Sequence, residues 1–543
     1  FEVFFCKSLL KSSLQSLLDN IFADASILKR IYDCLKDPAM ALASLYCRAL
    51  SGVDAPEVLV EVHLSTGLPS FSLVGLPETS VKEAKERVRS AITNSNYKFP
   101  FNKKITVNLA PANLAKEGGR FDLAIALAIL IASEQLSEIK SKQFECFAEL
   151  TLAGSLRPVD GIIPCVLAAK SANRAVIVPP ENQHEAALTG AEALVASSLT
   201  EVCAFFQDGK ILATAQAKTQ ARPKPPPDMC DVLGQEQAKR VLEIAATGGH
   251  NMLLVGPPGT GKSMLVERFM GLLPPLCEKH ALQTAAIYSV CGKDRDDWYQ
   301  APYRSPHHSA SSVALVGGGG KPKPGEISLS HRGVLFLDEL PEFPRAVLDS
   351  LRQPLETKRV TISRAANQVT FPANFQLIGA MNPSPCGHIS GELRRSTPDQ
   401  VLRYLGRLSG PFLDRFSLSI MVPLLPKGLL ASSQSGEENK GETTAQIKQR
   451  VLKARERQIQ RQAKLNHHLS TKEISDYCQL SEQDALFLEE AINKMGLSIR
   501  AWHSLLKVAR SIADLADSDS VERQHLLESL NYRAMDRLLK SVS

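Results

Sequence analysis

The chain has 543 residues, of which 44% are hydrophobic, so it is long enough to bury several cores, and its length suggests roughly three or four domains. The formal net charge of +6 is small for this size, which excludes a strongly basic chain, so any surface that binds nucleic acid must be local. The 11 cysteines contain no Cys-x-x-Cys pair, and no apolar run is long enough to cross a membrane, which predicts a cytoplasmic protein without a disulfide framework or membrane contact.

The first segment, residues 1–39, carries leucines at helical spacing but does not begin with methionine. Met40, in contrast, begins a stretch typical of a translation start. We interpret residues 1–39 as an upstream extension without a function of its own. A packed pair of N-terminal helices is the alternative.

Strands and helices alternate between residues 40 and 212, which predicts an α/β domain. Residues 58–64 and 104–109 alternate apolar and polar side chains as strands do, while residues 80–92 are typical of a charged amphipathic helix. The apolar run 124–131 predicts a buried helix.

Two motifs of this domain, Arg157-Pro-Val-Asp-Gly-Ile-Ile-Pro and Ile177-Val-Pro-Pro-Glu-Asn, resemble the protease domain of Lon and its relatives. Lon-type proteolysis needs a serine nucleophile and a lysine base. The corresponding loop, residues 116–122, has no serine, and the turn after Gly161, Ile-Ile-Pro-Cys, has no lysine. The resemblance therefore implies a Lon-like fold without the protease dyad, serving as a scaffold for partners or DNA. We expect Asp122 and Arg120 to form a buried ion pair; a ligand site is the alternative.

A proline-rich stretch within residues 213–228 favours an extended linker. Beyond it, the apolar run 252–255 breaks into the G-x-x-x-x-G-K-S pattern of a P-loop and then into a predicted helix. Its glycines let backbone N–H groups face phosphate oxygens, and the helix directs its positive N-terminal end at the same anion. The predicted nucleotide-binding residues of this loop are Gly256, Pro257, Pro258, Gly259, Thr260, Gly261, Lys262 and Ser263.

The expected ligands of this loop are ATP and Mg²⁺, with Lys262 at the β- and γ-phosphates and the Ser263 hydroxyl on the metal. A second buried strand ends in Asp338 and Glu339, and carboxylates are costly at such a place unless a metal or a reaction uses them. We expect Asp338 to hold Mg²⁺ and Glu339 to act as the catalytic base. A solvated strand end is the alternative.

The residues around these strands resemble AAA+ ATPases. The segment 231–239 leads into the P-loop as the AAA+ stretch over the adenine does, and Asn382 ends the next strand, where AAA+ proteins keep a polar residue that orients water. A turn-forming asparagine is the alternative reading of that position. Arg415 resembles the arginine finger that completes a neighbouring subunit's site, and Arg500 resembles the second sensor arginine. Arg403 and Arg407 compete for the finger role, and a solvent-facing arginine is the alternative for either assignment.

Two insertions interrupt this core. Residues 302–331 contain four consecutive glycines followed by Lys321-Pro-Lys323, which predicts a flexible basic loop. Residues 358–371 carry two short β-branched runs around Arg364, which predict a hairpin. Both insertions resemble those of the magnesium-chelatase and MCM-like branch of AAA+, where they face a central pore. The predicted DNA-binding residues are therefore Lys321, Lys323 and Arg364.

Two adjacent histidines, His307 and His308, lie within the first insertion. On a strand their side chains would point apart, which makes a poor chelating pair. We expect them to fix the loop by hydrogen bonds.

Three further motifs carry a more specific resemblance: Arg304-Ser-Pro-His-His-Ser-Ala-Ser311, Leu335-Phe-Leu-Asp-Glu-Leu-Pro-Glu342 and Leu408-Ser-Gly-Pro-Phe-Leu-Asp-Arg-Phe416. With them, the chain from residue 40 to about 536 resembles the ComM/YifB family. The predicted class is α/β, and the predicted domains are a Lon-like domain (40–212), a Pro-rich linker (213–228), a chelatase-like AAA+ P-loop core (229–425) and a C-terminal helical lid (426–543).

The resemblance implies an ATP-driven homo-hexameric DNA motor, a bidirectional or branch-migration helicase that aids DNA integration in natural transformation and homologous recombination. The implied partners are single-stranded and branched DNA, bound without sequence preference, and the recombinase machinery. One alternative is the ATPase subunit of a metal chelatase, and another is a non-helicase AAA+ remodelling protein or regulatory scaffold. The basic helix face at 449–457 is a further candidate for DNA contact, against the simpler interpretation as a solvated face.

Overall fold

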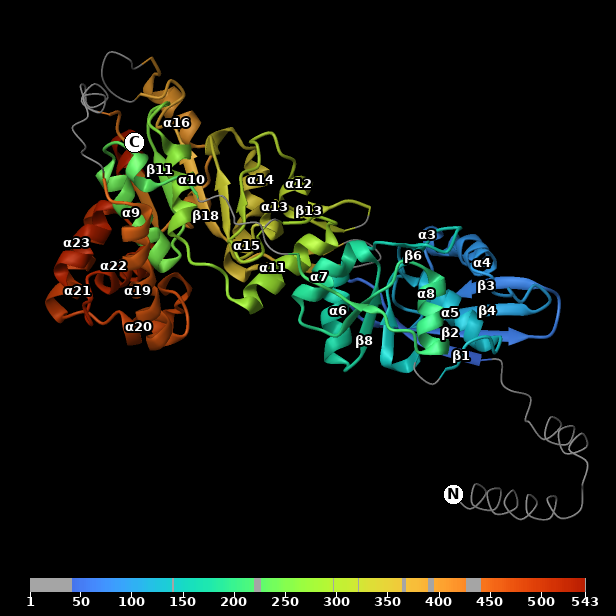
Figure 1. The fold of residues 1–543 in the computed structure, drawn as a ribbon. Helices are drawn as coiled ribbons and strands as arrows, with labels where there is room; N and C mark the ends of the chain where they lie inside the picture. Colours follow the sequence, from blue (N-terminus) through green and yellow to red (C-terminus); the bar gives the residue numbers. More distant parts are fainter. Residues whose placement is uncertain are drawn as a thin grey trace, which may run out of the picture.

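The computed structural model describes residues 42–138, 141–218, 226–295, 297–320, 322–363, 368–388, 395–425 and 441–542. The extension 1–39 and the predicted DNA-binding residues Lys321 and Arg364 lie outside the described residues. Figure 1 shows an elongated molecule in which an N-terminal α/β domain lies at one end and the P-loop core and helical lid lie at the other.

The N-terminal domain is built on an eight-stranded sheet with the order β10-β9-β8-β5-β1-β2-β4-β3. In β1, β2 and β4 buried and more exposed side chains alternate, as expected of strands with one face on the core. The strands are β1 (Leu42–Arg48), β2 (Glu57–Ser65), β3 (Ser70–Val74), β4 (Lys104–Ala110), β5 (Phe144–Cys146), β8 (Ala175–Val178), β9 (Ala193–Val195) and β10 (Ala213–Thr214), with a separate pair β6 (Glu149–Leu150) and β7 (Leu156–Arg157).

Helices cover this sheet, and the central one is α5, whose apolar sequence is buried along almost its whole length. A helix that is apolar all round must be enclosed, and α5 packs against β1, β2 and α4. The helices of this domain are α3 (Thr79–Lys82), α4 (Ala84–Asn94), α5 (Asp122–Ala132), α6 (Ile162–Ser171), α7 (Gln183–Leu188) and α8 (Leu199–Asp208).

The predicted ion pair between Asp122 and Arg120 is wrong. Asp122 begins α5 and faces α4, where its Oδ2 accepts a hydrogen bond of 2.6 Å from Arg87 Nε. Arg120 lies in the short 3₁₀ turn before α5 and points the other way, donating to the main-chain oxygen of Asp160 at 2.9 Å. The change of direction between turn and helix separates the two side chains.

The P-loop core holds a five-stranded parallel sheet with the order β12-β15-β18-β11-β19. The three central strands are almost entirely buried, as expected of a parallel sheet covered by helices on both faces. The strands are β11 (Met252–Val255), β12 (Tyr303–Arg304), β15 (Val334–Leu337), β18 (Gln376–Met381) and β19 (Leu418–Met421), and the main helices are α9 (Glu236–Gly248), α10 (Lys262–Leu272), α11 (Glu278–Val290), α14 (Arg345–Ser350), α15 (Arg352–Thr357), α16 (Pro398–Leu405) and α17 (Gly410–Leu413).

Both insertions contain regular structure. In the first, α12 (Ser312–Val316) leads into an antiparallel pair, β13 (Gly317–Gly318) and β14 (Lys323–Pro324), and then α13 (Glu326–Leu329). In the second, β16 (Arg359–Ser363) pairs antiparallel with β17 (Gln368–Pro372). The glycine-rich stretch that predicted a flexible loop therefore includes a short β ladder.

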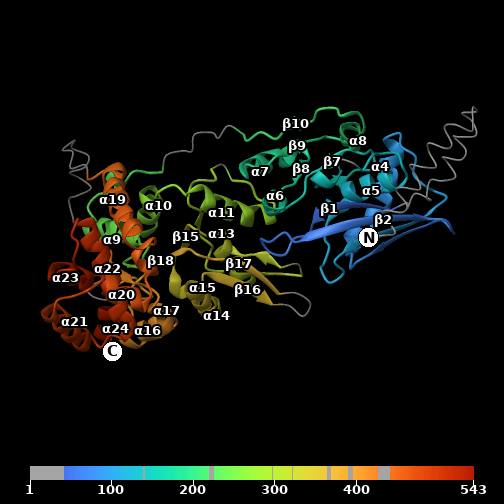
Figure 2. The same cartoon turned by 90° about the horizontal axis from the view of Figure 1, so that it is seen from below.

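The N-terminal domain and the core are in direct contact. The side chains of α11 join the N-terminal core cluster, and the Ser289 oxygen accepts a hydrogen bond of 2.8 Å from Gly161 N at the start of α6. Figure 2 shows α11 beside α6. A second contact places Gly52, in the turn after β1, against Val369 of β17. The strand β10 lies within the segment predicted as linker, yet it pairs with β9 at the edge of the N-terminal sheet.

The C-terminal helices form the lid, in which α19 and α22 pack against α9. The charged face at 449–457 is largely neutralised within the chain: Arg450 pairs with Glu243 and Glu442, and Arg457 pairs with Asp517 and Asp519. The lid helices are α19 (Thr444–Gln462), α20 (Thr471–Tyr477), α21 (Glu482–Met495), α22 (Ile499–Leu515), α23 (Arg523–Asn531) and α24 (Ala534–Val542).

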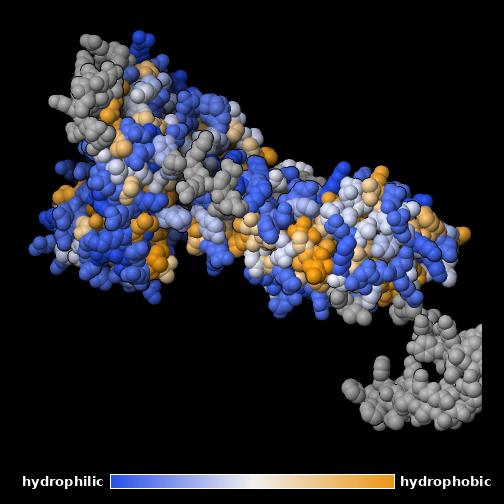
Figure 3. Space-filling model, in the orientation of Figure 1, coloured by the Kyte–Doolittle hydropathy of each residue, from blue (hydrophilic) through white to orange (hydrophobic). Residues whose placement is uncertain are grey.

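The predicted fold class, an α/β chain with a parallel core sheet and a C-terminal helical region, is confirmed. The face shown in Figure 3 is mostly hydrophilic over the lid and the core, and apolar residues gather on the N-terminal domain. No helix within the described ranges has the length and apolarity of a membrane span.

Candidate nucleotide-binding and hydrolysis site

Three neighbouring strands of the core sheet end in the predicted site residues. The P-loop follows β11, Asp338 and Glu339 follow β15, and Asn382 follows β18, which lies between the other two strands. Because the strands are parallel, their carboxyl ends meet at one edge of the sheet. The fold therefore brings together residues as far apart in the sequence as Gly256 and Asn382.

The P-loop has the backbone of an anion cradle. Gly259 and Gly261 have φ angles of +78° and +82°, which favour glycine, and a Cβ added at Gly259 would meet only open space. Gly256 is needed for a different reason, since a Cβ there would lie 2.4 Å from the Val422 oxygen. The loop then enters the N-terminus of α10, where backbone N–H groups have no partner within the helix.

Lys262 is positioned over the loop. Its Nζ donates to the main-chain oxygens of Gly256 and Pro257 at 2.8 and 2.9 Å, and to Asn382 Oδ1 at 3.2 Å. Burial lowers the pKa of Lys262, and the nearby Asp338 and Glu339 act in the opposite direction. A polyphosphate in the cradle would give this ammonium group a stronger partner than the two carbonyls.

Ser263 and Asp338 meet across the site, with the Ser263 hydroxyl donating to Asp338 Oδ2 at 2.7 Å. A hydroxyl and a carboxylate, both oxygen donors, are the ligands that Mg²⁺ prefers, together with water and phosphate oxygens. These residues therefore fit the metal that a P-loop uses. When bound, Mg²⁺ would neutralise charge on the phosphates.

Glu339 follows Asp338 in a left-handed backbone conformation, with φ of +51°. The turn is fixed by a hydrogen bond of 2.8 Å from its own N–H to Asp338 Oδ1. Its carboxylate Oε2 lies 3.2 Å from His308 Nδ1, in the first insertion. The acid predicted as catalytic base is thus in contact with a segment far from it in sequence.

The loop after Asn382 packs against the P-loop, because Gly387 lies so close to Pro258 that a Cβ would meet the ring at 2.5 Å. Cys386 lies in this loop, and hydrogen bonds from Ser384 and Ser396 lower its pKa to about 5. The predicted water-orienting residue and a readily ionised thiol are therefore carried by one loop.

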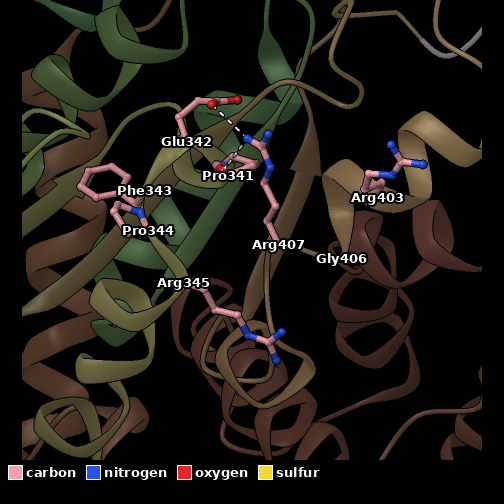
Figure 4. Close-up of a pocket in the computed structure, with 8 residues that line it drawn as sticks. All are labelled: Pro341, Glu342, Phe343, Pro344, Arg345, Arg403, Gly406 and Arg407. Carbon is pink, nitrogen blue, oxygen red and sulfur yellow. Dashed lines mark hydrogen bonds and ion pairs between the residues drawn. The ribbon is translucent and has the colours of Figure 1, made fainter.

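A pocket of about 460 Å³ lies beyond the acidic strand end, between the turn 341–345 and α16. Figure 4 shows Arg407 extending toward Glu342, with which it forms an ion pair at 3.0 Å, while Arg403 and Arg345 project from α16 and α14. Arg403 and Arg407, the competitors for the finger role, thus line a pocket in their own subunit.

Arg415 and Arg500 converge on one carboxylate. Both guanidinium groups contact Glu356 Oε1 of α15, Arg500 at 3.0 Å. The main-chain oxygen of Arg415 accepts a hydrogen bond from Asn251, which precedes β11, so Arg415 lies at the end of that strand opposite the P-loop. The strand separates these ends by about 13 Å, too far for an arginine side chain to span comfortably.

Of the predicted DNA-binding residues, Lys323 lies in the described part of the chain, exposed on β14. Two contacts were not predicted from the sequence. One is that of His308 with Glu339, and the other is that of Glu356 with both Arg415 and Arg500. The histidine pair also differs from expectation: the chain turns at His307, and the two rings lie 4.0 Å apart instead of pointing apart. The Ser-Pro-His-His motif could have indicated that His308 belongs to the site, whereas no sequence motif around Glu356 indicates its role.

Three protein families match this chain. The family described as magnesium chelatase, subunit ChlI, matches residues 228–430, and the corresponding C-terminal family matches residues 441–533. A third family, described as subunit ChlI of Mg-chelatase, matches residues 60–182 in the N-terminal domain.

Similar proteins cover nearly the whole chain. Competence protein ComM of Haemophilus influenzae is 54% identical over 512 residues, which span 93% of this chain and 100% of that protein. Uncharacterized protein YifB of Escherichia coli is 54% identical over 503 residues, spanning 92% and 98%. The magnesium-chelatase 38 kDa subunit of Cereibacter sphaeroides is 25% identical over 213 residues, 35% of this chain and 57% of that subunit.

Proposed function

Because this chain belongs to the ComM/YifB family of magnesium-chelatase-like AAA+ proteins, we propose that it is an ATP-driven hexameric DNA motor that moves branch points during the integration of incoming DNA. The observation that carries the proposal is the meeting of the P-loop, Asp338, Glu339 and Asn382 at one sheet edge. A scaffold that only binds a nucleotide would need the phosphate cradle, whereas hydrolysis also needs an acid such as Glu339 to accept a proton from water.

In the proposed reaction, Lys262 binds the β- and γ-phosphates, and Ser263 with Asp338 holds the metal. Glu339 accepts a proton from the attacking water, and Asn382, already within 3.2 Å of Lys262 Nζ, orients that water near the γ-phosphate. Replacing Glu339 by glutamine should therefore leave ATP bound but lower turnover by roughly 10²- to 10⁴-fold.

The position of Arg415 supports a site shared between subunits. Because Arg415 and Arg500 lie away from the P-loop of their own chain, their charges are available to a phosphate held by a neighbour. Arg415 is the proposed finger and Arg500 the proposed second sensor. Glu356 neutralises part of their charge within the chain.

We place the DNA at the two insertions. Lys323 is exposed on β14, and six copies around a ring would concentrate positive charge that a net charge of +6 per chain does not reveal. Lys321 and Arg364 complete this proposed set. Their contacts go to phosphates, which makes binding independent of sequence and sensitive to salt.

The test is ATP hydrolysis by the purified chain, measured alone, with single-stranded DNA and with a four-way junction. DNA should stimulate hydrolysis, and a labelled junction should be resolved by wild type but not by Glu339→Gln. ATP hydrolysis that does not respond to DNA, with no movement of the junction, would contradict the motor. It would favour the ATPase subunit of a metal chelatase, since the Cereibacter sphaeroides relative is named as a magnesium-chelatase subunit.

A further inference from the structure

A group of basic side chains lies where the lid meets the base of the hairpin β16–β17. The lid contributes His467 and His468, in a short 3₁₀ turn, and Lys507 of α22. The core contributes Lys358, which joins α15 to β16, and Arg332, which precedes β15. We call these five residues the junction cluster.

Direct contacts hold the cluster together. Lys358 Nζ lies 2.9 Å from His468 Nδ1, and Lys507 Nζ donates to the His467 main-chain oxygen at 3.1 Å. The rings of His467 and His468 lie 5.4 Å apart. An ammonium group can only donate hydrogen bonds, so His468 Nδ1 accepts from Lys358, and the proton of this ring lies on Nε2. His468 therefore adds an N–H donor to the two ammonium groups.

The main chain fixes the two core members of the cluster. Arg332 N donates to the Asn374 oxygen at 2.6 Å, and the Lys358 oxygen accepts from Ala373 N at 2.8 Å. Residues 373 and 374 lie between the hairpin and β18, so both cations are held at the sheet edge where β15 and β18 begin. The P-loop lies at the opposite edge, about 13 Å away along β11. The junction cluster is therefore separate from the hydrolysis site.

The cluster has no counter-charge of its own. In the described ranges, none of Arg332, Lys358 and Lys507 forms an ion pair with a carboxylate. Glu473, the carboxylate whose charge acts on Lys507, already pairs with Lys464 at 2.6 Å. Burial, followed by the charge of Arg332, lowers the pKa of Lys358. The three cations are thus close enough to repel one another, and no acid compensates them.

Two polar atoms of the cluster are also short of partners. Arg332 Nε and His467 Nδ1 are buried, and neither has a hydrogen-bond partner in the described part of the chain. The Arg332 guanidinium donates to Gln283 Oε1 at 3.4 Å, which uses one of its five N–H groups. Because native proteins pair nearly all of their buried polar groups, unpaired donors beside uncompensated cations indicate a place where an anion binds.

From this geometry we infer that the junction cluster binds a phosphate group. Phosphate fits the donor set, because its oxygens accept several hydrogen bonds at once and its negative charge compensates Arg332, Lys358 and Lys507 together. Two sources supply such a group, free phosphate and the DNA backbone, and the hairpin that follows Lys358 is one of the insertions at which we place DNA. The site goes beyond the proposed function, since it lies away from the nucleotide and needs no hydrolysis.

The experiment measures thermal unfolding of wild type, Lys358→Gln, Lys507→Gln and the control Lys494→Gln, in sodium phosphate and in sodium chloride of equal ionic strength. Lys494 is exposed at the end of α21. A saturating non-hydrolysable ATP analogue with Mg²⁺ occupies the P-loop throughout. Phosphate at about ten times its dissociation constant should raise the melting temperature of wild type and Lys494→Gln by roughly 3 to 6 °C over chloride. The two cluster variants should lose this shift.

The chloride measurements separate a binding role from a structural one. Without phosphate, Lys358→Gln and Lys507→Gln should melt at or above the wild-type temperature, because glutamine keeps an N–H donor and removes one of several like charges. A lysine with only a structural role would instead lower the melting temperature by the same amount in both salts, and that result would overturn the inference.

Single-stranded DNA distinguishes the two sources of phosphate. Binding of a labelled oligonucleotide to the same four proteins is measured over a range of salt concentrations. A DNA phosphate in the cluster predicts weaker binding in both cluster variants, with a salt dependence lower by about one phosphate contact, whereas free phosphate predicts wild-type DNA binding in all four proteins. Equal phosphate shifts in all four proteins, together with equal DNA binding, would also overturn the inference. Failure of the proposed function leaves the phosphate shift unchanged, because that shift requires neither hydrolysis nor movement of DNA.

Discussion

Glu185 lies at the contact between the N-terminal domain and the core, where its Oε2 accepts a hydrogen bond of 3.2 Å from the Ser289 hydroxyl of α11. Burial, assisted by Asp294 and Asp160, raises the pKa of Glu185 to about 7, while the hydrogen bond from Ser289 acts in the opposite direction. The carboxyl group of Glu185 binds its proton more tightly in the folded protein than in the unfolded chain, so its protonation stabilises the fold. This stabilisation is fully present below pH 4.5 and is lost as the pH rises through about 7.

The size of the effect follows from the shift in pKa. One pKa unit corresponds to about 1.4 kcal/mol, so the shift from 4.5 to about 7 is worth about 3 kcal/mol. The side chain is only partly buried, and solvent screening reduces this to roughly 2 kcal/mol. Glu185→Gln keeps the shape and an acceptor for Ser289 without the charge, so it should stabilise the protein at pH 8 relative to wild type.

The assay is thermal unfolding of wild type and Glu185→Gln at pH 5 and pH 8. The melting temperature of Glu185→Gln minus that of wild type should be roughly 4 to 8 °C larger at pH 8 than at pH 5, for a domain of this size. Glu181→Gln removes a charge from an exposed position four residues earlier and serves as the control. An equal difference between wild type and Glu185→Gln at both pH values would refute the reasoning.

Further predictions concern the site itself. Lys262→Ala should abolish ATP binding, because it removes the charge that faces the phosphates; unchanged affinity in a titration would exclude that role. Arg415→Ala should be inactive alone, yet mixing it with Lys262→Ala should restore some turnover if sites are shared, whereas an inactive mixture would argue against sharing. Lys323→Gln should weaken DNA binding and lower the salt dependence of the affinity by the equivalent of about one phosphate contact. An unchanged salt dependence would show that Lys323 does not contact DNA. Cys386, with its pKa near 5, should be alkylated at pH 6 roughly tenfold faster than the exposed Cys277, as peptide mass spectrometry can measure; equal rates would show that the thiol is not ionised.

The amino-acid sequence by itself determined the parts of this protein whose chemistry is local. A P-loop requires glycines, a lysine and a hydroxyl within eight consecutive positions, so its place between a strand and a helix was evident before the fold was known. The strand that precedes Asp338 and Glu339 was equally predictable, because an apolar run that ends in two acids marks the carboxyl end of a core strand. The ends of parallel strands share one edge, which made the meeting of these segments predictable as well.

Tertiary structure alone decided which side chains face one another across the molecule. Asp122 pairs with Arg87 and not with Arg120, because a turn before α5 reverses the direction of the nearer arginine. The basic face of α19 is neutralised by acids from other helices, which no charge pattern within that helix could reveal.

At the candidate site, too, tertiary structure decides the contacts. Glu356 pairs with both Arg415 and Arg500, and His308 contacts Glu339. These contacts join positions 31 to 144 residues apart, and their geometry depends on how helices and insertions pack. A local pattern fixes the conformation and chemistry of a segment through its own backbone, but the partner of an exposed or half-buried charge is chosen by packing between distant segments.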